Sequence, residues 1–465
     1  MLLMGKDVNQ TADVIAGVCE YLNAGNVSET GIQSFSFTLP AGSSVHWLAW
    51  LSVQPHYPQF YWQHRDGHEE VVACGKIRLF NNIAGAEKFL QQYHQVSQMR
   101  LWGLNAWDKM DSEHCHHRYF CHDNVWQDKH KNQDNHENIA GGESYLFLPR
   151  LELRRHRGEN RLYINVDGKA DIKNACRFLR QLLPHQPFLP LQTTVLEAKH
   201  VPESKQWHIL LEQALEAITK SKMEKVVIAR KTELTLNSPL QAAQFMAASR
   251  EVNHRCYHFM LAFSANHAFL ASTPERLYYR NQLQFCTEAL AGTVANSEDD
   301  QEAAKLAQWL LDDKKNQHEN LIVVDDICQR LQGGIASVDV TPPDVIRLRK
   351  VQHLRRHIRG VLSHVCDSDC LRRLQPTAAV AGLPREAARQ FLSDNEPFNR
   401  GWYAGSAGYL CLEQSEFAVS LRCAHIYDNL LSLYAGAGIV AGSDPEQEWL
   451  EIENKAAGLR TLLVN

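Results

Sequence analysis

The sequence lacks the features that mark several large classes of protein. Its formal net charge is only −5 over 465 residues, so it has no basic surplus to neutralise a phosphate backbone or an anionic membrane surface. No apolar run approaches the roughly 20 residues that cross a bilayer, and the N-terminus has neither the basic nor the long apolar segment of a secretory signal. We therefore expect a cytoplasmic protein whose partner is a small molecule, not a nucleic acid or a membrane.

The sequence also lacks any Cys-x-x-Cys pair, although it contains twelve cysteines. Closely spaced cysteine pairs are typical of structural zinc sites and redox motifs. In a reducing compartment, scattered cysteines are most simply interpreted as small buried hydrophobic residues or inert thiols.

Residues 109–140 are the exception, because this polar segment contains Cys115, Cys121 and a cluster of histidines. Imidazole and thiolate are the usual ligands of zinc, which makes a zinc site one interpretation. The spacing is looser than in structural zinc sites and few apolar residues flank it, so a flexible surface insertion is the alternative. A metal-binding scaffold built around this segment on an inactive fold is our non-enzymatic hypothesis.

The remaining composition, 44% hydrophobic and 22% charged, is that of an ordinary globular protein. We find no internal repeat and no regular βαβ cadence, which argues against a doubly wound parallel sheet. The pattern instead predicts an α+β fold with large antiparallel sheets. Hydrophobic periodicity predicts strands at 47–53, 59–62, 71–80, 144–153, 161–166 and 225–236, and helices at 86–96, 208–219, 312–331 and 445–463.

Two residues suggest acid and base chemistry. Lys225 precedes an apolar Val-Val-Ile run, and an amine held beside a closed cleft loses solvation, so that its neutral form can remove a proton from water. Glu288 follows Phe285 and Cys286 in a predicted strand, and a partly buried carboxyl stays protonated more easily and can donate to a leaving hydroxyl. The alternatives are a surface lysine at a strand end and a solvated glutamate.

Carboxylates on two predicted helices suggest a cation. Glu448, Glu451 and Lys455 are spaced i, i+3 and i+7, within about 60° on a helical wheel. Together with Glu319 they offer the hard oxygen ligands that Mg²⁺ prefers. The alternative is a salt-bridged, solvated helix face.

Main-chain and arginine groups suggest an anion site. Glycines at 436–438 follow an apolar strand end, where main-chain amides can approach an anion without an intervening Cβ. Arg422 is predicted late in an alternating strand over 416–422 and can clamp a carboxylate with two hydrogen bonds. A tight turn and an exposed arginine are the alternatives.

Ordered motifs over residues 205–465 resemble the chorismate-utilising enzymes. The N-terminal half, with its Phe-Tyr-Trp-Gln-His-Arg-Asp stretch at 60–66, is similar to the menaquinone-pathway isochorismate synthases. The motifs that carry the family resemblance are Phe-Leu-Ala-Ser-Thr-Pro-Glu-Arg-Leu at 269–277, Thr-Glu-Ala-Leu-Ala-Gly-Thr at 287–293, Lys-Lys-Asn-Gln-His-Glu-Asn at 314–320, Val-Gln-His-Leu at 351–354, Leu-Gln-Pro-Thr-Ala-Ala-Val-Ala-Gly at 374–382, Arg-Gly-Trp-Tyr-Ala-Gly at 400–405 and Tyr-Ala-Gly-Ala-Gly-Ile-Val-Ala-Gly-Ser-Asp-Pro at 434–445.

The resemblance implies one large α+β domain of stacked antiparallel sheets flanked by helices, with residues 1–200 as its N-terminal half and 201–465 as the chorismate-binding catalytic region. It implies that Lys225 activates water for attack at C2 of chorismate and that Glu288 protonates the departing C4 hydroxyl. The resemblance further implies that Glu319 and Glu451 hold Mg²⁺ on the ring carboxylate, with Glu448 assisting through water. The implied substrate-binding groups are Tyr403, Arg422, Gly436 and Gly438 at the enolpyruvyl carboxylate and Thr293, His353 and Lys455 along the pocket.

Two positions qualify this reaction. Asn316 replaces an acidic residue found in some relatives. The resemblance therefore does not imply a further carboxylate ligand for the metal at this position. Ala291 stands where aminodeoxychorismate synthases often carry a covalent lysine, so hydroxylation fits better than amination. The expected activity is isomerisation of chorismate to isochorismate, with a downstream menaquinone-pathway enzyme consuming the product. A salicylate synthase and a siderophore-pathway isochorismate synthase are the enzymatic alternatives.

Overall fold

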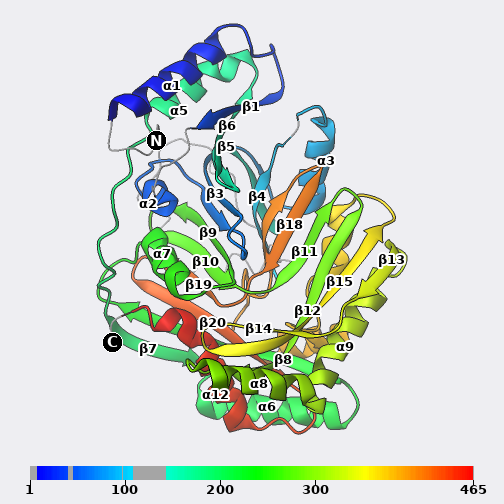
Figure 1. Cartoon of the computed structure of the whole chain (residues 1–465). Helices are drawn as coiled ribbons and strands as arrows, with labels where there is room; N and C mark the ends of the chain where they lie inside the picture. The colour runs from blue at the N-terminus through cyan, green and yellow to red at the C-terminus, as the bar shows by residue number, and fades with distance from the viewer. Residues whose placement is uncertain (1–7, 40–45, 97, 108–142, 464–465) are drawn as a thin grey trace.

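The computed structural model of the chain describes residues 8–39, 46–96, 98–107 and 143–463 (Figure 1). The segment at 109–140, and with it the zinc interpretation and the surface-insertion interpretation, lies outside the described residues.

Strands are the more numerous elements among the described residues. They are β1 (Ile32–Leu39), β2 (Gln59–Gln63), β3 (Glu69–Phe80), β4 (Leu101–Asn105), β5 (Ser144–His156), β6 (Glu159–Asp167), β7 (Val195–Val201), β8 (Lys225–Leu236), β9 (Tyr257–Ser264), β10 (His267–Thr273), β11 (Arg276–Asn281), β12 (Gln284–Ala295), β13 (Ile335–Val340), β14 (Asp344–Arg347), β15 (Val351–Leu362), β16 (Gly382–Leu383), β17 (Ser406–Leu410), β18 (Gln414–Val419), β19 (Cys423–Tyr427) and β20 (Leu430–Ile439). The helices are α1 (Val8–Asn23), α2 (Trp47–Ser52), α3 (Ile83–Gln92), the short 3₁₀ helix η1 (Lys169–Asp171), α5 (Ile172–Arg180), α6 (Ser204–Thr219), α7 (Ala242–Val252), α8 (Asp300–Asp312), α9 (Lys314–Leu331), α10 (Asp367–Leu374), α11 (Arg385–Asn395) and α12 (Pro445–Arg460).

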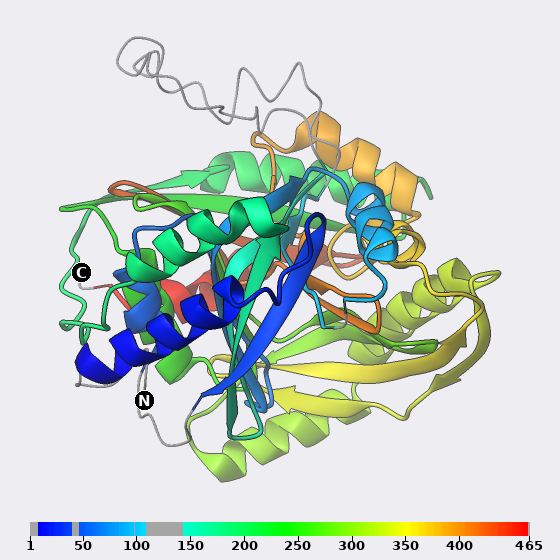
Figure 2. The ribbon, with the colours of Figure 1, turned by 90° about the horizontal axis from the view of Figure 1, so that it is seen from above.

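Each strand pairing among the described residues is antiparallel. The main path through the sheet runs β15–β12–β11–β18–β17–β4–β5–β3–β2–β9–β10–β19–β20–β8–β7. Strands β13 and β14 add to β15, β6 and then β1 add to β5, and β16 adds to β8. Helix α6 packs against α12 and α8 against α9 at the lower end of the view in Figure 1, and Figure 2 shows α6 on the opposite side of the molecule from α8 and α9. Helices α1 and α5 lie side by side at the other end.

The two halves of the chain share this sheet. Strand β2 pairs with β9, and β4 pairs with β17, so strands of the N-terminal half lie between strands of the C-terminal half. Aromatic contacts also join the two halves. The ring centroid of Trp102 lies 6.1 Å from that of Trp62 and 5.0 Å from that of Tyr409 in the C-terminal half. The predicted α+β fold, in which both halves build antiparallel sheets with helices outside, is confirmed.

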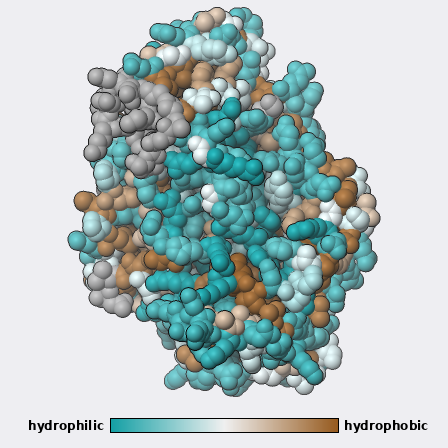
Figure 3. All heavy atoms as spheres, viewed as in Figure 1, coloured by the Kyte–Doolittle hydropathy of each residue, from teal (hydrophilic) through white to brown (hydrophobic). Residues whose placement is uncertain are grey.

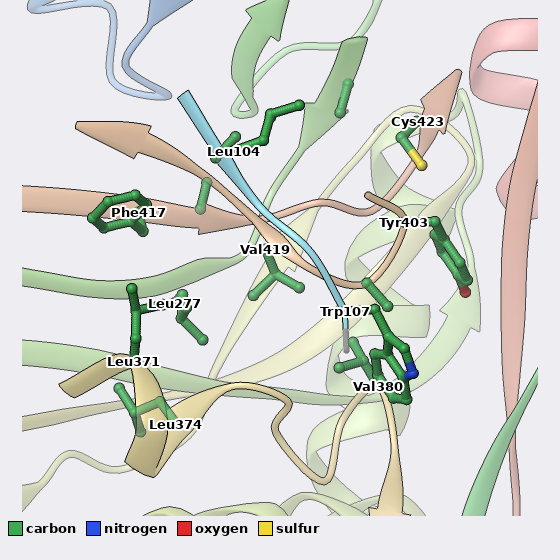
Figure 4. Close-up of a cluster of buried hydrophobic side chains, with 14 of the residues drawn as sticks. Leu104, Trp107, Leu277, Leu371, Leu374, Val380, Tyr403, Phe417, Val419 and Cys423 are labelled. Carbon is green, nitrogen blue, oxygen red and sulfur yellow. The ribbon is translucent and has the colours of Figure 1, made fainter. Parts of the chain in front are cut away.

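The core lies between the sheet layers and takes side chains from distant segments. Figure 4 shows Leu104 and Trp107 from the N-terminal half near Phe417, Val419 and Tyr403 from the C-terminal half. All five side chains are buried. Hydrophilic side chains cover most of the face seen in Figure 3. Among the described residues, we find no helix with the length and apolar character that a membrane span requires.

One predicted strand is wrong. The run at 47–53 forms α2, a short helix, and not a strand. Its residues Trp47, Leu48, Ala49, Trp50 and Leu51 are all buried, so the helix is apolar on every side. A short run that is apolar throughout has no periodicity to separate a buried helix from a buried strand.

Capping residues fix where the two helices of the candidate site begin. The Asp313 side chain accepts a hydrogen bond from the Asn316 amide at 2.8 Å and starts α9. Asp444 does the same for α12 from the Gln447 amide at 3.0 Å, with Pro445 at the first helical position. Both arrangements satisfy amides that have no partner within the helix. They set the rotation of α9 and α12, and thereby the direction in which their glutamates point.

Candidate active site

Lys225 begins β8 and is almost completely buried, with 1% of its surface exposed. Its Nζ donates a hydrogen bond to Oε1 of Glu319 on α9 at 2.9 Å. Gly438 of β20 lies against both groups, because a Cβ built there would be 3.0 Å from Cε of Lys225 and 3.3 Å from Oε1 of Glu319. The absence of a side chain at Gly438 therefore makes space for the amine and the carboxylate. The fold brings together Lys225, Glu319 and Gly438, three of the predicted site residues.

Strand β20 presents main chain to the same region. It pairs with β8 as far as Ile439, whereas its pairing with β19 ends at Tyr434. The carbonyl of Gly436 accepts a hydrogen bond from Nζ of Lys455 at 2.9 Å. A Cβ on Gly436 would lie 2.6 Å from the Tyr403 hydroxyl, which is closer than side chains tolerate. The glycine thus allows the buried tyrosine to approach the strand.

Helix α12 supplies two carboxylates and a lysine on one face, as the spacing predicted. Lys455 pairs with Glu451 at 2.7 Å between Nζ and Oε1. Glu448 is buried one turn earlier. Burial and the negative charge of Glu451 raise the pKa of Glu448 to about 7. Glu448 and Glu451 therefore lie close together on this face of α12. Lys455 links the face to the sheet through the Gly436 carbonyl.

Thr293, His353 and Arg422 form a hydrogen-bonded row. Arg422 donates from Nη2 to Nε2 of His353 at 2.7 Å, and Nδ1 of His353 lies 3.0 Å from the Thr293 hydroxyl. Burial and the nearby Arg422 charge hold the pKa of His353 well below its usual range. The imidazole is therefore neutral, and because Nε2 accepts from the guanidinium, Nδ1 carries the proton. The row fixes the orientation of Arg422.

The predicted location of Arg422 needs correction. It was expected late in a strand over 416–422, but β18 ends at Val419 and β19 starts at Cys423. Arg422 occupies the connection with φ of +48°, a left-handed conformation that is uncommon outside glycine. Such strain persists where surrounding contacts impose it, and here the hydrogen bond to His353 is one of them.

The Thr-Glu-Ala-Leu-Ala-Gly-Thr motif contains a bulge that brings α9 to the sheet. The register between β12 and β15 shifts between Leu290 and Thr293, and Gly292 has φ of +86°. The Asn316 side chain accepts a hydrogen bond from the Thr293 amide at 3.0 Å. Asn320 donates to the carbonyls of Ala289, Ala291 and Leu354. The Asn316 side chain also donates a hydrogen bond to the Asp313 carboxylate at 2.8 Å, which an ionised acidic side chain could not do.

Glu288 does not have the environment that the sequence predicted. Its side chain is fully buried, but Arg65 donates to both carboxylate oxygens at 2.6 and 2.8 Å, and the Arg276 amide donates to Oε1 at 2.7 Å. Burial favours the neutral acid, but the Arg65 charge and these hydrogen bonds outweigh it and hold the pKa of Glu288 below its usual range. The protein alone therefore favours the ionised form of Glu288, and its role as the acid stays a prediction from the sequence.

Sequence reasoning missed Glu275, which joins β10 to β11 and is buried with 2% of its surface exposed. Burial and the negative charge of Glu288 raise the pKa of Glu275 to about 8. The positive charges of Lys225 and Arg422 act in the opposite direction and lower the pKa of Glu275, but by less. A carboxyl of this kind is protonated at neutral pH. The only sequence signal was its place in the Thr-Pro-Glu-Arg motif, which we used for family resemblance alone.

The donor set of the predicted metal site fits Mg²⁺. Glu319, Glu448 and Glu451 supply oxygen ligands from two helices, and Mg²⁺ keeps several waters and needs only one or two carboxylates. This tolerance matters because the three carboxylates do not form a group with all ligand atoms within 4.8 Å among the described residues. Lys225 and Lys455 hold two of them by ion pairs in the protein alone.

Arg65→Ala should strongly destabilise the protein. The substitution removes the partner of a fully buried carboxylate, and breaking such a pair costs about 3–5 kcal/mol in the free energy of unfolding. Denaturant titration measures this loss. The matched control is Arg78→Ala, whose ion pair with Asp167 is far more exposed and should contribute no more than about 1 kcal/mol. Equal, small losses in both variants would contradict the importance of the buried pair.

Comparison with known proteins places the chain among homologues over nearly its full length. A family model described as chorismate binding enzyme matches residues 20–464. The isochorismate synthase MenF of Escherichia coli K12 is 48% identical over 437 residues, which cover 93% of this chain and 94% of that protein. MenF of Pasteurella multocida Pm70 is 37% identical and covers 90% of each chain.

Solved structures agree. The menaquinone-specific isochorismate synthase MenF from E. coli superposes with a TM-score of 0.88 at 46% identity, covering 97% of this chain and 99% of that one. Anthranilate synthase component I from Streptococcus pneumoniae TIGR4 superposes with a TM-score of 0.63 at 21% identity, covering 87% of this chain and 91% of that one, and so shares the fold.

Proposed function

The chain belongs to the chorismate-binding enzyme family, and we propose that it isomerises chorismate to isochorismate with Mg²⁺, for menaquinone synthesis. The family, the fold and the assignment as an isochorismate synthase were predicted from the sequence, and the full-length similarity bears them out. The observation that carries the mechanism is the buried amine of Lys225, which is held 2.9 Å from Glu319, one of the carboxylates proposed to bind the metal.

Lys225 is the proposed base. In its neutral form the amine takes a proton from water as the water oxygen bonds to C2 of chorismate. The ring double bonds shift, and the C4–O bond breaks. Glu275 is the acid that we propose, because burial and the charge of Glu288 raise its pKa to about 8 and keep it able to donate to the departing hydroxyl, which leaves as water. Glu288, the acid that the family resemblance implies, stays the alternative. One proton is taken up and one is given, so the reaction is balanced and reversible.

Cationic and main-chain groups are proposed to hold the substrate anions. Arg422, oriented by His353, and the Tyr403 hydroxyl are placed to bind the enolpyruvyl carboxylate beside the open edge of β20. Thr293 and Lys455 complete the pocket. These groups fix the ring so that C2 and C4 meet different proton-transfer groups, which is where orientation contributes to rate.

Glu319, Glu448 and Glu451 are the residues proposed to hold Mg²⁺. When bound, the ion would neutralise the ring carboxylate of the substrate and compete with Lys225 for Glu319. The identity of the cofactor, a cytoplasmic location and a downstream menaquinone-pathway enzyme stay predictions from the sequence. A reversible isomerisation stops at equilibrium, so an enzyme that consumes isochorismate would be needed to draw the flux forward.

Purified protein incubated with chorismate and Mg²⁺ should accumulate isochorismate until an equilibrium mixture forms, as followed by chromatography. Removing divalent ions with a chelator should abolish turnover, and added Mg²⁺ should restore it. Starting from isochorismate should give the same mixture. Accumulation of salicylate and pyruvate would refute the proposal and favour a salicylate synthase, and full activity in chelator would refute the metal requirement.

A further inference from the structure

A second set of metal-ligating side chains lies outside the proposed active site, on the turn between β2 and β3. His64, Asp66 and His68 each offer one ligand atom, and these atoms all lie within 4.8 Å of one another. Nδ1 of His64 is 3.7 Å from Oδ2 of Asp66, and the His64 and His68 ring centroids are 3.9 Å apart. Two ligands about 2.1 Å from a tetrahedral zinc ion are separated by about 3.4 Å, so the distance between Nδ1 of His64 and Oδ2 of Asp66 is close to that of two zinc ligands.

The backbone of this turn is well determined. The His64 amide donates to the Glu69 carbonyl at 2.9 Å, and the Gly67 amide donates to the His64 carbonyl at 2.8 Å. Gly67 adopts φ of +72°, which lets the chain reverse at that point. The ladder of β2 and β3 continues to the pair Gln63 and Glu70. Alternate residues 64, 66 and 68 are thus gathered by a closed turn and not by a loose loop.

The exposure of the three ligands suits a site that is open to solvent. The His64 side chain is 3% exposed, whereas that of Asp66 is 72% exposed. Nε2 of His64 lies 3.4 Å from the Glu416 carboxylate, and Nδ1 accepts a hydrogen bond from the Asp66 amide at 3.1 Å, which a metal ion at Nδ1 would replace. We propose that His64, Asp66 and His68 bind a borderline divalent transition-metal ion such as Zn²⁺, with water completing the coordination. Imidazole nitrogen distinguishes this site from the all-oxygen set of Glu319 and its neighbours, which suits Mg²⁺.

The position of this site gives the ion a structural consequence. Arg65 lies between the two ligands His64 and Asp66, and its guanidinium makes the two hydrogen bonds to buried Glu288. An ion bound to this turn would therefore hold in place the backbone on either side of Arg65, and with it the contact between Arg65 and Glu288. Binding is independent of catalysis and is measured without substrate.

Zinc titration of the full chain tests this site, with a chromophoric chelator as competitor and millimolar Mg²⁺ to fill oxygen-rich sites. The variants are Asp66→Asn and His68→Gln. The matched control is His156→Gln, which removes a half-exposed histidine whose ring is 5.6 Å from that of His68 but which is not in the ligand group. We expect wild type and control to bind one zinc ion that both variants bind at least tenfold more weakly.

Zinc should also raise the melting temperature of the wild type and the control more than that of either variant, because an ion that binds the folded state stabilises it. Anomalous diffraction from zinc-soaked crystals should place an ion between His64 and His68. The same zinc stoichiometry and affinity in all four proteins would overturn the proposal and put binding elsewhere, including residues 109–140. So would diffraction without an ion at the turn.

Discussion

Lys225→Ala should lower kcat by about 10²- to 10⁴-fold, the range that a positioned base contributes. The amine is buried at the start of β8, and Gly438 and Glu319 fix its position. Among the described residues, no other lysine forms an ion pair with Glu319, and Lys455 instead contacts the Gly436 carbonyl and Glu451. The measurement is steady-state isochorismate formation at saturating chorismate and Mg²⁺.

The control for this experiment is Lys231→Ala on the same strand. Lys231 pairs with Glu233 and makes no contact with the predicted site residues in the described part of the chain, so the control should keep wild-type turnover. Circular dichroism and thermal melting check that Lys225→Ala folds, and chorismate binding to the variant should persist. Near-normal activity in a folded Lys225→Ala variant would remove this residue as the base.

Sequence patterns located the elements of the site well. The strand predicted at 225–236 coincides with β8, and the helix predicted at 445–463 differs from α12 only at its end. Both have clear periodicity, and α12 has a proline and a capping aspartate at its start. Helix-wheel spacing also gave the shared face of Glu451 and Lys455. Local patterns sufficed because each of these features depends on residues that are close in the chain.

The pairing of distant residues needed the structure. Lys225 on β8 and Glu319 on α9 are separated by 94 positions and meet only in the folded chain. Their association was available from the sequence only through family resemblance. The row of Thr293, His353 and Arg422 also had no local signal. The β12 bulge at Gly292 sets where Thr293 faces, and a register shift cannot be read from the hydrophobic pattern.

The environment of Glu288 also depends on a residue that is distant in the chain. Burial was a reasonable inference for a glutamate within an apolar strand, and the side chain is indeed buried. Burial alone favours the protonated acid, but a paired cation reverses the effect. That cation, Arg65, is 223 residues away along the chain. Glu275, by contrast, is in none of the ion pairs found among the described residues. Its burial and the negative charge of Glu288 outweigh the nearby cations and raise its pKa.

Glu275→Gln should therefore lower kcat by about 10²- to 10⁴-fold, comparable with Lys225→Ala. Glutamine keeps the size of the side chain and a hydrogen-bond donor but cannot transfer a proton to the departing C4 hydroxyl. Glu288→Gln is the matched comparison, because it changes the neighbouring carboxyl in the same way. We expect Glu288→Gln to lower stability by removing the partner of Arg65 while retaining substantially more activity than Glu275→Gln.

The pH dependence separates the two carboxyls further. Glu275 donates only when protonated, and its pKa is raised to about 8, so wild-type kcat/KM should fall as the pH rises through about 8. Glu288, with its pKa below the usual range, is ionised throughout that window and produces no such limb. The residual activity of Glu275→Gln should lack the fall near pH 8, whereas Glu288→Gln should keep it. Loss of proton transfer in Glu288→Gln together with normal turnover in Glu275→Gln would restore Glu288 as the acid.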